Sequence, residues 1–357
     1  MVSYQPCCNN FTLILCLLVL LPTTVLGNSK CKDEAGQQHN RHDALKFKLI
    51  AIATILVAGG IGVSLPQLGK KVSALNPEND IFFMIKAFAA GVILATGFVH
   101  ILPEAFSTLT SPCIQNTWKK FPFAGFVAMM SSIGTLIVDT VAAGYYRRSH
   151  FEKDKQAVVD EEMVQDNEHE IHVHHQTHAH AHGSALLSQD EQRKLTDLTR
   201  HRVISQVLEL GIIVHSIIIG VTLGASESPD TIKTLLAALS FHQFFEGLGL
   251  GGCISQAKFK SLHSTIMTVF FSLTTPMGIA IGIGISHVYR ENTPTALIVQ
   301  GIFNSASAGI LIYMALVDLL AADFMDQRMQ SNARLQVAAN ISLLLGASCM
   351  SVLAIWA

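Results

Sequence analysis

Two neighbouring stretches decide the fold: residues 203–224, VISQVLELGIIVHSIIIGVTLG, and residues 232–253, IKTLLAALSFHQFFEGLGLGGC. Each is an apolar run of the length that a helix needs to cross the hydrocarbon core of a bilayer, about 20 residues. Further runs of this kind lie at 47–68, 82–106, 123–145, 265–288, 295–321 and 335–356. Continuous apolar runs fit helices, whereas a membrane barrel needs alternating residues. The sequence therefore predicts an all-α membrane protein with eight transmembrane helices.

The composition agrees with a chain whose main partner is the lipid bilayer. Of the 357 residues, 50% are hydrophobic and only 14% are charged, whereas soluble globular proteins carry roughly 25% charged residues. Lys and Arg number 24 against 26 for Asp and Glu, a net charge of −2. Because there is no basic excess, we expect no nucleic-acid partner.

The first residues predict a secretory signal. The run Phe11–Leu21 is too short to span a bilayer and is followed by small residues up to Gly27, which favours a cleaved signal peptide over residues 1–27, with an uncleaved anchor as the alternative. An outside amino terminus would place Cys31 and Cys113 on the oxidising side. Whether these two cysteines pair is left open.

Four segments follow from the apolar runs and the positive-inside rule. They are the signal peptide over 1–27, an extracellular segment with transmembrane helices 1–3 over 28–146, a cytoplasmic loop over 147–202, and transmembrane helices 4–8 over 203–357. The expected cytoplasmic connections carry basic pairs such as Arg147 and Arg148.

The cytoplasmic loop is rich in histidine. Its histidines are His169, His172, His174, His175, His178, His180 and His182. Neutral imidazole is a good ligand for zinc and related ions, so we expect this tract to contact metal. A flexible tract without fixed supporting residues suits capture or sensing better than transport.

Ionisable residues inside predicted spans indicate a substrate path. His215 and Ser216 lie in the fourth span, and His242, Gln243 and Glu246 lie in the fifth. His242 and Glu246 are four residues apart and share a helix face. At 1.5 Å per residue, His215 lies about 18 Å along its helix and His242 about 15 Å along the next, so both reach mid-depth. We expect His215, His242 and Glu246 to bind a borderline divalent ion, with Ser216 and Gln243 adjoining.

Other polar residues extend this path at its two ends. His100 and Glu104, four residues apart near the outer end of the second span, are expected to form an entrance. Pro103 between them can kink the helix. Asp139 and Glu209, near the cytoplasmic ends of their spans, are expected to form an exit.

Three remaining polar residues and a glycine pattern complete the spans. Asn304 and Asp318 are polar positions in apolar surroundings without an assigned role. Lys86 is expected to snorkel to the inner membrane surface. Glycines four residues apart predict close helix packing, and these pairs are Gly220 and Gly224, Gly247 and Gly251, and Gly278 and Gly282.

The motifs together resemble the ZIP (Zrt/Irt-like) metal transporters, in their plant subgroup. The resemblance rests on His215-Ser216 followed by Gly220, His242-Gln243 followed by Glu246-Gly247, His100 followed by Pro103-Glu104, and the histidine-rich loop after the third span. It implies uptake of Zn²⁺, Fe²⁺ or related ions into the cytosol through eight helices in a 3+2+3 arrangement. It also implies that the first three and last three spans are inverted repeats, and that a group containing spans four and five slides against a scaffold.

One departure from the family pattern bears on the number of ions. Bacterial relatives carry extra acidic ligands where this sequence has Ile219 and Gln243. We therefore expect one transported ion, with no resident cofactor, held mainly by His215, His242 and Glu246. Whether a second metal position exists is left open.

Three other classes of protein share some of these features. An intramembrane metalloprotease needs His-Glu-x-x-His, a string that the sequence lacks, so we expect no enzyme activity. A metal exporter or a metal-responsive receptor remains the alternative. We expect the plasma membrane as the location, with an internal membrane as the alternative, and a homodimer is left open.

Overall fold

In the computed structural model, the described residues are 41–70, 79–114, 116–165, 189–286, 293–325 and 327–355, and these form helices and short connections without any strand. The helices of six residues or more are α2 (Arg41–Ser64), α3 (Asp80–Ala95), η4 (Thr96–Ile101), α4 (Leu102–Leu109), α6 (Phe123–Gln165), α7 (Gln189–Ala225), α8 (Pro229–Gln256), α9 (Ser261–Ile285), α10 (Pro294–Tyr313), η5 (Met314–Ala321) and α13 (Ala333–Leu353). The short ones are η2 (Pro66–Lys70), α5 (Asn116–Lys120), α11 (Ala322–Phe324) and α12 (Gln327–Ser331). The predicted all-α class is confirmed for the described part of the chain.

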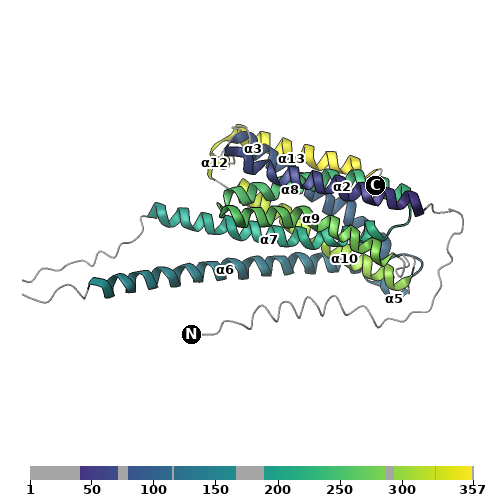
Figure 1. Ribbon diagram of the computed structural model, residues 1–357, viewed down its shortest axis with the longest axis horizontal. Helices are drawn as coiled ribbons and strands as arrows, with labels where there is room; N and C mark the ends of the chain where they lie inside the picture. Colours follow the sequence, from purple (N-terminus) through teal and green to yellow (C-terminus); the bar gives the residue numbers. More distant parts are fainter. Residues whose placement is uncertain are drawn as a thin grey trace, which may run out of the picture.

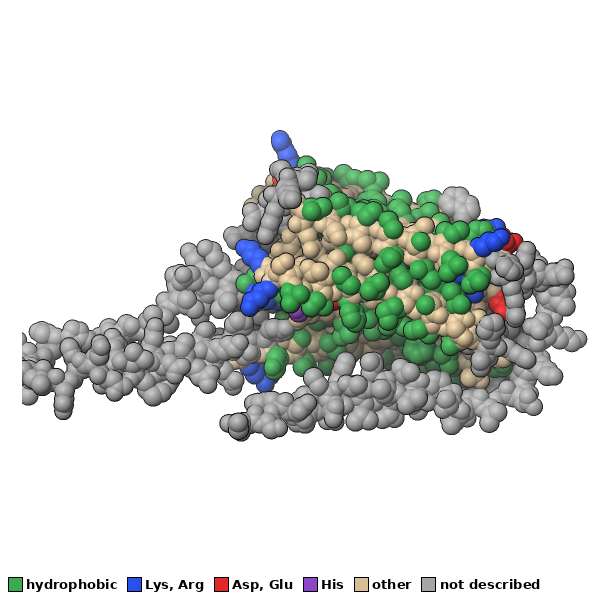
Figure 2. Space-filling view, in the orientation of Figure 1, with side chains coloured by type: hydrophobic (Ala, Val, Ile, Leu, Met, Phe, Trp, Pro, Cys, Tyr) green, Lys and Arg blue, Asp and Glu red, His purple; other side chains and the backbone are tan. Residues whose placement is uncertain are grey.

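Seven helical segments of the described chain are long and apolar enough to cross a membrane. They are Asp43–Gly69, Asp80–Leu109, Phe123–Tyr145, Arg200–Ala225, Ser261–Ile285, Pro294–Phe324 and Ala333–Leu353. Figure 2 shows hydrophobic side chains across the middle of the visible face and Lys, Arg, Asp and Glu at its two ends. Such a belt is what a lipid environment requires.

The remaining predicted span corresponds to α8, a helix of 28 residues. It does not meet the same apolar criterion, because His242, Gln243 and Glu246 lie within it. These three side chains are at most 2% exposed. Burial among neighbouring helices shields α8 from lipid, so its polar residues do not meet the hydrocarbon.

The helices pack in pairs. α2 lies along α8, α7 along α9, α3 along α13, and α10 along α6 (Figure 1). A Cβ added at Gly220 would lie 2.7 Å from the carbonyl oxygen of Thr275 on α9, and one at Gly247 would lie 2.9 Å from the amide nitrogen of Val63 on α2. No side chain fits at such a distance, so the predicted close packing at these glycines is confirmed.

Two spans contain a π-helical segment. In one, η4 lies directly before α4, where Pro103 occupies the first turn. Proline lacks an amide proton, and a widened turn of this kind is a recognised cause of helix kinks. The predicted distortion at Pro103 is therefore present as a π-helix. The other is η5, which contains Asp318.

The helices on either side of the predicted cytoplasmic loop extend into it. α6 continues to Gln165 and α7 begins at Gln189, so both run past the ends of the apolar runs at 147 and 202. Figure 1 shows both helices projecting beyond the bundle at one end. Charged helix-forming residues continue a helix in water although they cannot continue a membrane span. The predicted boundaries mark the apolar runs and not the helix ends.

Several predictions fall outside the described residues. These are the signal peptide over 1–27 and the histidines from His169 to His182.

Cys113 is disulfide-bonded, whereas Cys253 and Cys349 are free. Cys31, whose pairing with Cys113 the sequence leaves open, also lies outside the described residues.

Candidate metal centre

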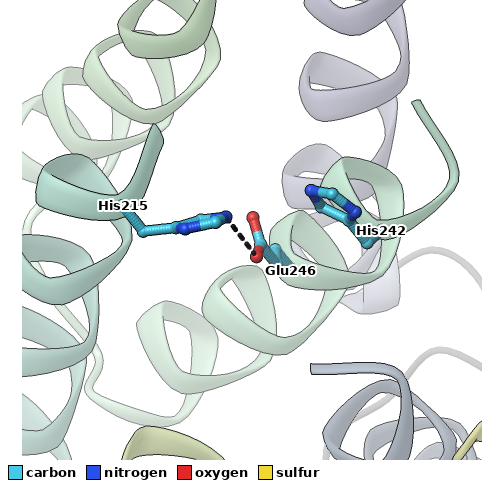
Figure 3. A group of neighbouring side chains, drawn as sticks. All are labelled: His215, His242 and Glu246. Atoms are coloured by element: carbon cyan, nitrogen blue, oxygen red, sulfur yellow. Dashed lines mark ion pairs between the residues drawn. The ribbon is translucent and has the colours of Figure 1, made fainter. Parts of the chain in front are cut away.

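Three side chains from two adjacent helices converge inside the bundle. His242 and Glu246 lie one turn apart on α8, and His215 reaches them from α7 (Figure 3). One potential ligand atom from each of the three lies within 4.8 Å of the others. Nε2 of His215 is 3.7 Å from Oε1 of Glu246, and the two imidazole centroids are 5.9 Å apart. We call this group the metal centre.

The ligand atoms of the metal centre are buried and unsatisfied. His215 and His242 are each 1% exposed and Glu246 is 0% exposed. Among the described residues, Nε2 of His215, one ring nitrogen of His242 and both carboxylate oxygens of Glu246 have no hydrogen-bond partner. Burying a polar group without a partner costs roughly 1–3 kcal/mol on mutational scales, and a charge costs more. A dication bound here would take one nitrogen from each imidazole together with the carboxylate of Glu246.

The two residues that adjoin the centre behave differently. Ser216 is 1% exposed and its hydroxyl has no partner, so it remains available to an ion or a water. Gln243 accepts a hydrogen bond through Oε1 from the hydroxyl of Thr275 on α9, at 3.0 Å, while its Nε2 has no partner among the described residues. Its side chain also contacts α2 at Gly59. The structure therefore places Gln243 in the packing between helices, beside the centre.

The predicted entrance residues lie on a different span from the ligands of the metal centre. His100 lies in η4 and Glu104 in α4, and both side chains are partly buried. Nε2 of His100 is buried without a partner. Oε1 of Glu104 accepts a hydrogen bond from Nε2 of Gln300 on α10, at 3.4 Å. This pair faces α10, which also carries Asn304, a buried amide that lies within hydrogen-bonding reach of the Glu104 carboxylate.

The predicted exit residues are not brought together with the metal centre. Asp139 on α6 accepts a hydrogen bond from the hydroxyl of Tyr313 on α10, at 3.0 Å. Glu209 on α7 is partly exposed. Asp318, to which the sequence assigned no role, is 2% exposed and both of its carboxylate oxygens lack a partner.

Sequence reasoning missed a contact to the centre and misjudged a lysine. Ser307 on α10 makes a hydrogen bond with Nδ1 of His215, although it lies 92 positions away in the chain. The expectation that Lys86 snorkels is wrong, because its side chain is 3% exposed and its Nζ lies 2.8 Å from Oδ1 of Asp323. No local pattern signals either contact, since both depend on how distant helices pack.

Comparison with known proteins agrees with this architecture. The sequence model of the ZIP zinc transporters matches residues 45–354. The chain is 54% identical to Zinc transporter 8 of Oryza sativa subsp. japonica over 91% of this chain and 92% of that protein. It is 53% identical to Zinc transporter 3 of Arabidopsis thaliana, over 93% and 91%, and 50% identical to Fe(2+) transport protein 1 of Oryza sativa subsp. japonica, over 91% and 88%. The chain is therefore a multi-pass membrane protein that belongs to the ZIP zinc transporter family.

Proposed function

We propose that this divalent metal ion transporter carries Zn²⁺ into the cytosol through the metal centre of His215, His242 and Glu246, with Fe²⁺ as the alternative ion. Several similar relatives carry the name zinc transporter and others the name Fe(2+) transport protein. The observation that carries the proposal is the convergence of two imidazoles and a carboxylate whose ligand atoms are buried without partners.

The ligand set suits an ion in transit. Two nitrogens and one or two oxygens match the preferences of Zn²⁺ and Fe²⁺. When Glu246 binds through one oxygen, the three protein ligands leave one position of a tetrahedral ion for water or for the hydroxyl of Ser216. A closed cage of four protein ligands would bind more tightly, whereas transport requires that the ion leave again. One ion held in this way is the expected stoichiometry.

The path on either side of the centre uses residues that the sequence singled out. His100 and Glu104 would form the entrance, and Asp139 and Glu209 the exit. Partly buried carboxylates and imidazoles can replace the hydration shell of a dication in steps. The histidines between His169 and His182 would act as a cytosolic capture or sensing tract and not as the transport site.

The fold proposed for this function has eight crossings in a 3+2+3 order, with α8 as the fifth. Two features support inverted repeats. In these repeats, α2, α3 and α6 of the first three crossings would correspond to α9, α10 and α13 of the last three. The pairing of α2 with α8 corresponds to that of α9 with α7, and the pairing of α3 with α13 corresponds to that of α10 with α6. The second and seventh crossings also share a π-helical segment. A cleaved signal peptide, an extracellular amino terminus and a plasma-membrane location belong to the same proposal.

Zinc uptake into liposomes that contain the purified chain tests the proposal. The variant with His215, His242 and Glu246 all replaced by alanine should lose uptake, while His263→Ala, at an exposed histidine on α9, should transport like the parent. A fluorescent zinc indicator trapped in the lumen reports flux, which separates a transporter from a receptor that only binds. Uptake by the triple variant at the parental rate would refute the centre.

Direction and ion choice need a second measurement. In zinc-starved or iron-starved cells, the chain should raise cytosolic metal, whereas an exporter would lower it. Competition of radioactive zinc uptake by Fe²⁺ and other divalent ions then ranks the substrates. A fall in cytosolic metal on expression would overturn the proposed direction.

A further inference from the structure

Ser307 touches the metal centre from outside its two helices. It lies on α10, is 1% exposed, and its hydroxyl makes a hydrogen bond with Nδ1 of His215. The other ring nitrogen of His215, Nε2, points at the carboxylate of Glu246 (Figure 3). The imidazole therefore has one nitrogen directed at a hydroxyl and the other at the centre.

We infer that Ser307 is a positioning residue that prepares His215 to bind the transported ion, an inference that rests on the proposed function. A neutral imidazole carries one proton, and the nitrogen that lacks it is the ligand. When Nδ1–H donates to the hydroxyl oxygen of Ser307, the lone pair lies on Nε2 and faces Glu246. Histidine ligands in metal sites almost always have such a partner on the second nitrogen.

The two imidazoles of the centre differ in this respect. His215 has its partner, Ser307, on a third helix, whereas the partner of the His242 ring is the backbone carbonyl of Ala238, one turn back on α8 itself. The orientation of His215 therefore depends on how α7 packs against α10, while that of His242 depends on its own helix.

The packing between α7 and α10 holds this contact in place. One turn before His215, a Cβ added at Gly211 would lie 2.8 Å from the side chain of Ile310 on α10 and would also collide with Met314. The two helices therefore approach closely beside Ser307. Because Ser307 is on α10 and the ligands are on α7 and α8, any displacement of α7 along α10 breaks the contact. The inference thus predicts that Ser307 orients His215 in one position of α7 and that this hydrogen bond is absent in another position.

Concentration-dependent zinc uptake into liposomes tests this role. Loss of a partner to a metal-binding histidine typically costs about 10–100-fold in metal affinity, so Ser307→Ala should raise KM by about 10-fold or more. Vmax per molecule should change by less than about twofold. Ser307→Thr keeps a hydroxyl at the same carbon and should restore KM.

A matched control lies two residues away on the same helix. Ser305 is 0% exposed and donates its hydroxyl to the carbonyl oxygen of Gly301, at 2.6 Å. Ser305→Ala makes the same chemical change without touching the centre and should leave KM unchanged. If Ser307→Ala does not reach the membrane, Ser307→Cys takes its place; a thiol is a weak hydrogen-bonding group, so an intermediate KM is expected.

The outcomes distinguish a failure of the inference about Ser307 from a failure of the proposed transport through the metal centre. A parental KM for Ser307→Ala, or for Ser307→Cys in its place, overturns the positioning role, as does a KM increase equal to that of Ser305→Ala. If His215→Ala transports zinc like the parent, the proposed centre itself is wrong. If His215→Ala is inactive while the Ser307 variant keeps the parental KM, only the inference about Ser307 fails.

Discussion

Removing one member of the buried ion pair between Lys86 and Asp323 should destabilise the fold. Lys86 on α3 and Asp323 on α11 have side chains that are 3% and 9% exposed, with Nζ 2.8 Å from Oδ1. Nζ also donates to Oε1 of Gln256 at the end of α8, at 3.1 Å. The pair therefore connects two spans that are far apart in sequence and reaches the helix that carries the metal centre.

The size of the effect follows from the burial. Breaking a buried ion pair by removing one partner costs about 3–5 kcal/mol, because the remaining charge is left without compensation. Asp323 lies near a helix end, where water can reach it after the change, so Lys86→Met should cost about 3 kcal/mol, at the low end of that range. At about 2 °C per kcal/mol, Tm should fall by about 6 °C.

The double variant Lys86→Met with Asp323→Leu gives the decisive comparison. Replacing both charges by apolar side chains of similar volume is often neutral or stabilising, so Tm should return to within about 2 °C of the parent at that same slope. The assay is the fraction of monodisperse protein that survives heating in detergent. Lys46→Met is the control, because its pair with Asp43 has side chains that are 68% and 42% exposed and should contribute below about 1 kcal/mol. A double variant that is less stable than Lys86→Met would refute the reasoning.

Three further predictions address packing, the loop and the entrance. Gly282→Val should prevent folding or lower Tm strongly, because its Cβ would collide with the α7 backbone, whereas Gly284→Ala, which meets nothing within 4 Å, should be neutral or slightly stabilising in the same heating assay. Deletion of residues 169–182 should leave zinc flux measurable in liposomes, and complete loss would move the transport site into the loop. His100→Ala and Glu104→Gln should each slow zinc uptake, while the zinc affinity of the purified protein stays the same. Competition with a chromophoric chelator measures that affinity. A loss of affinity equal to the loss of uptake would place His100 and Glu104 in the metal centre.

The sequence predicted what depends on local length and spacing. Apolar runs of membrane-spanning length located the helices, because a bilayer has a nearly fixed thickness. The four-residue spacing of His242 and Glu246 placed them on one helix face, and the depth of His215 along the preceding span predicted that it lies at their level. Glycine spacing likewise located the close contacts of α7 with α9.

What the sequence could not predict depends on which helix faces which. Ser307 is an ordinary serine in an apolar span until α10 is seen to pack against α7 beside His215. Lys86 and Asp323 are 237 positions apart, and a lysine near the end of a span reads equally well as one that snorkels. The extension of α6 and α7 beyond the membrane-spanning runs has a different cause, because hydropathy reports where lipid ends and not where helical hydrogen bonding ends.

The helix α8 shows why a strict apolar criterion passes over an ion-binding helix that the proposed fold counts as its fifth crossing. A helix that binds an ion must carry polar ligands, and each ligand lowers the apolar content by which a span is recognised. Such a helix is stable within a bilayer only when other helices surround it. In this chain, α2 packs along one side of α8 through glycine contacts, and His242, Gln243 and Glu246 are at most 2% exposed. The weakest apolar signal and the strongest functional signal therefore fall on the same helix, for the same physical reason.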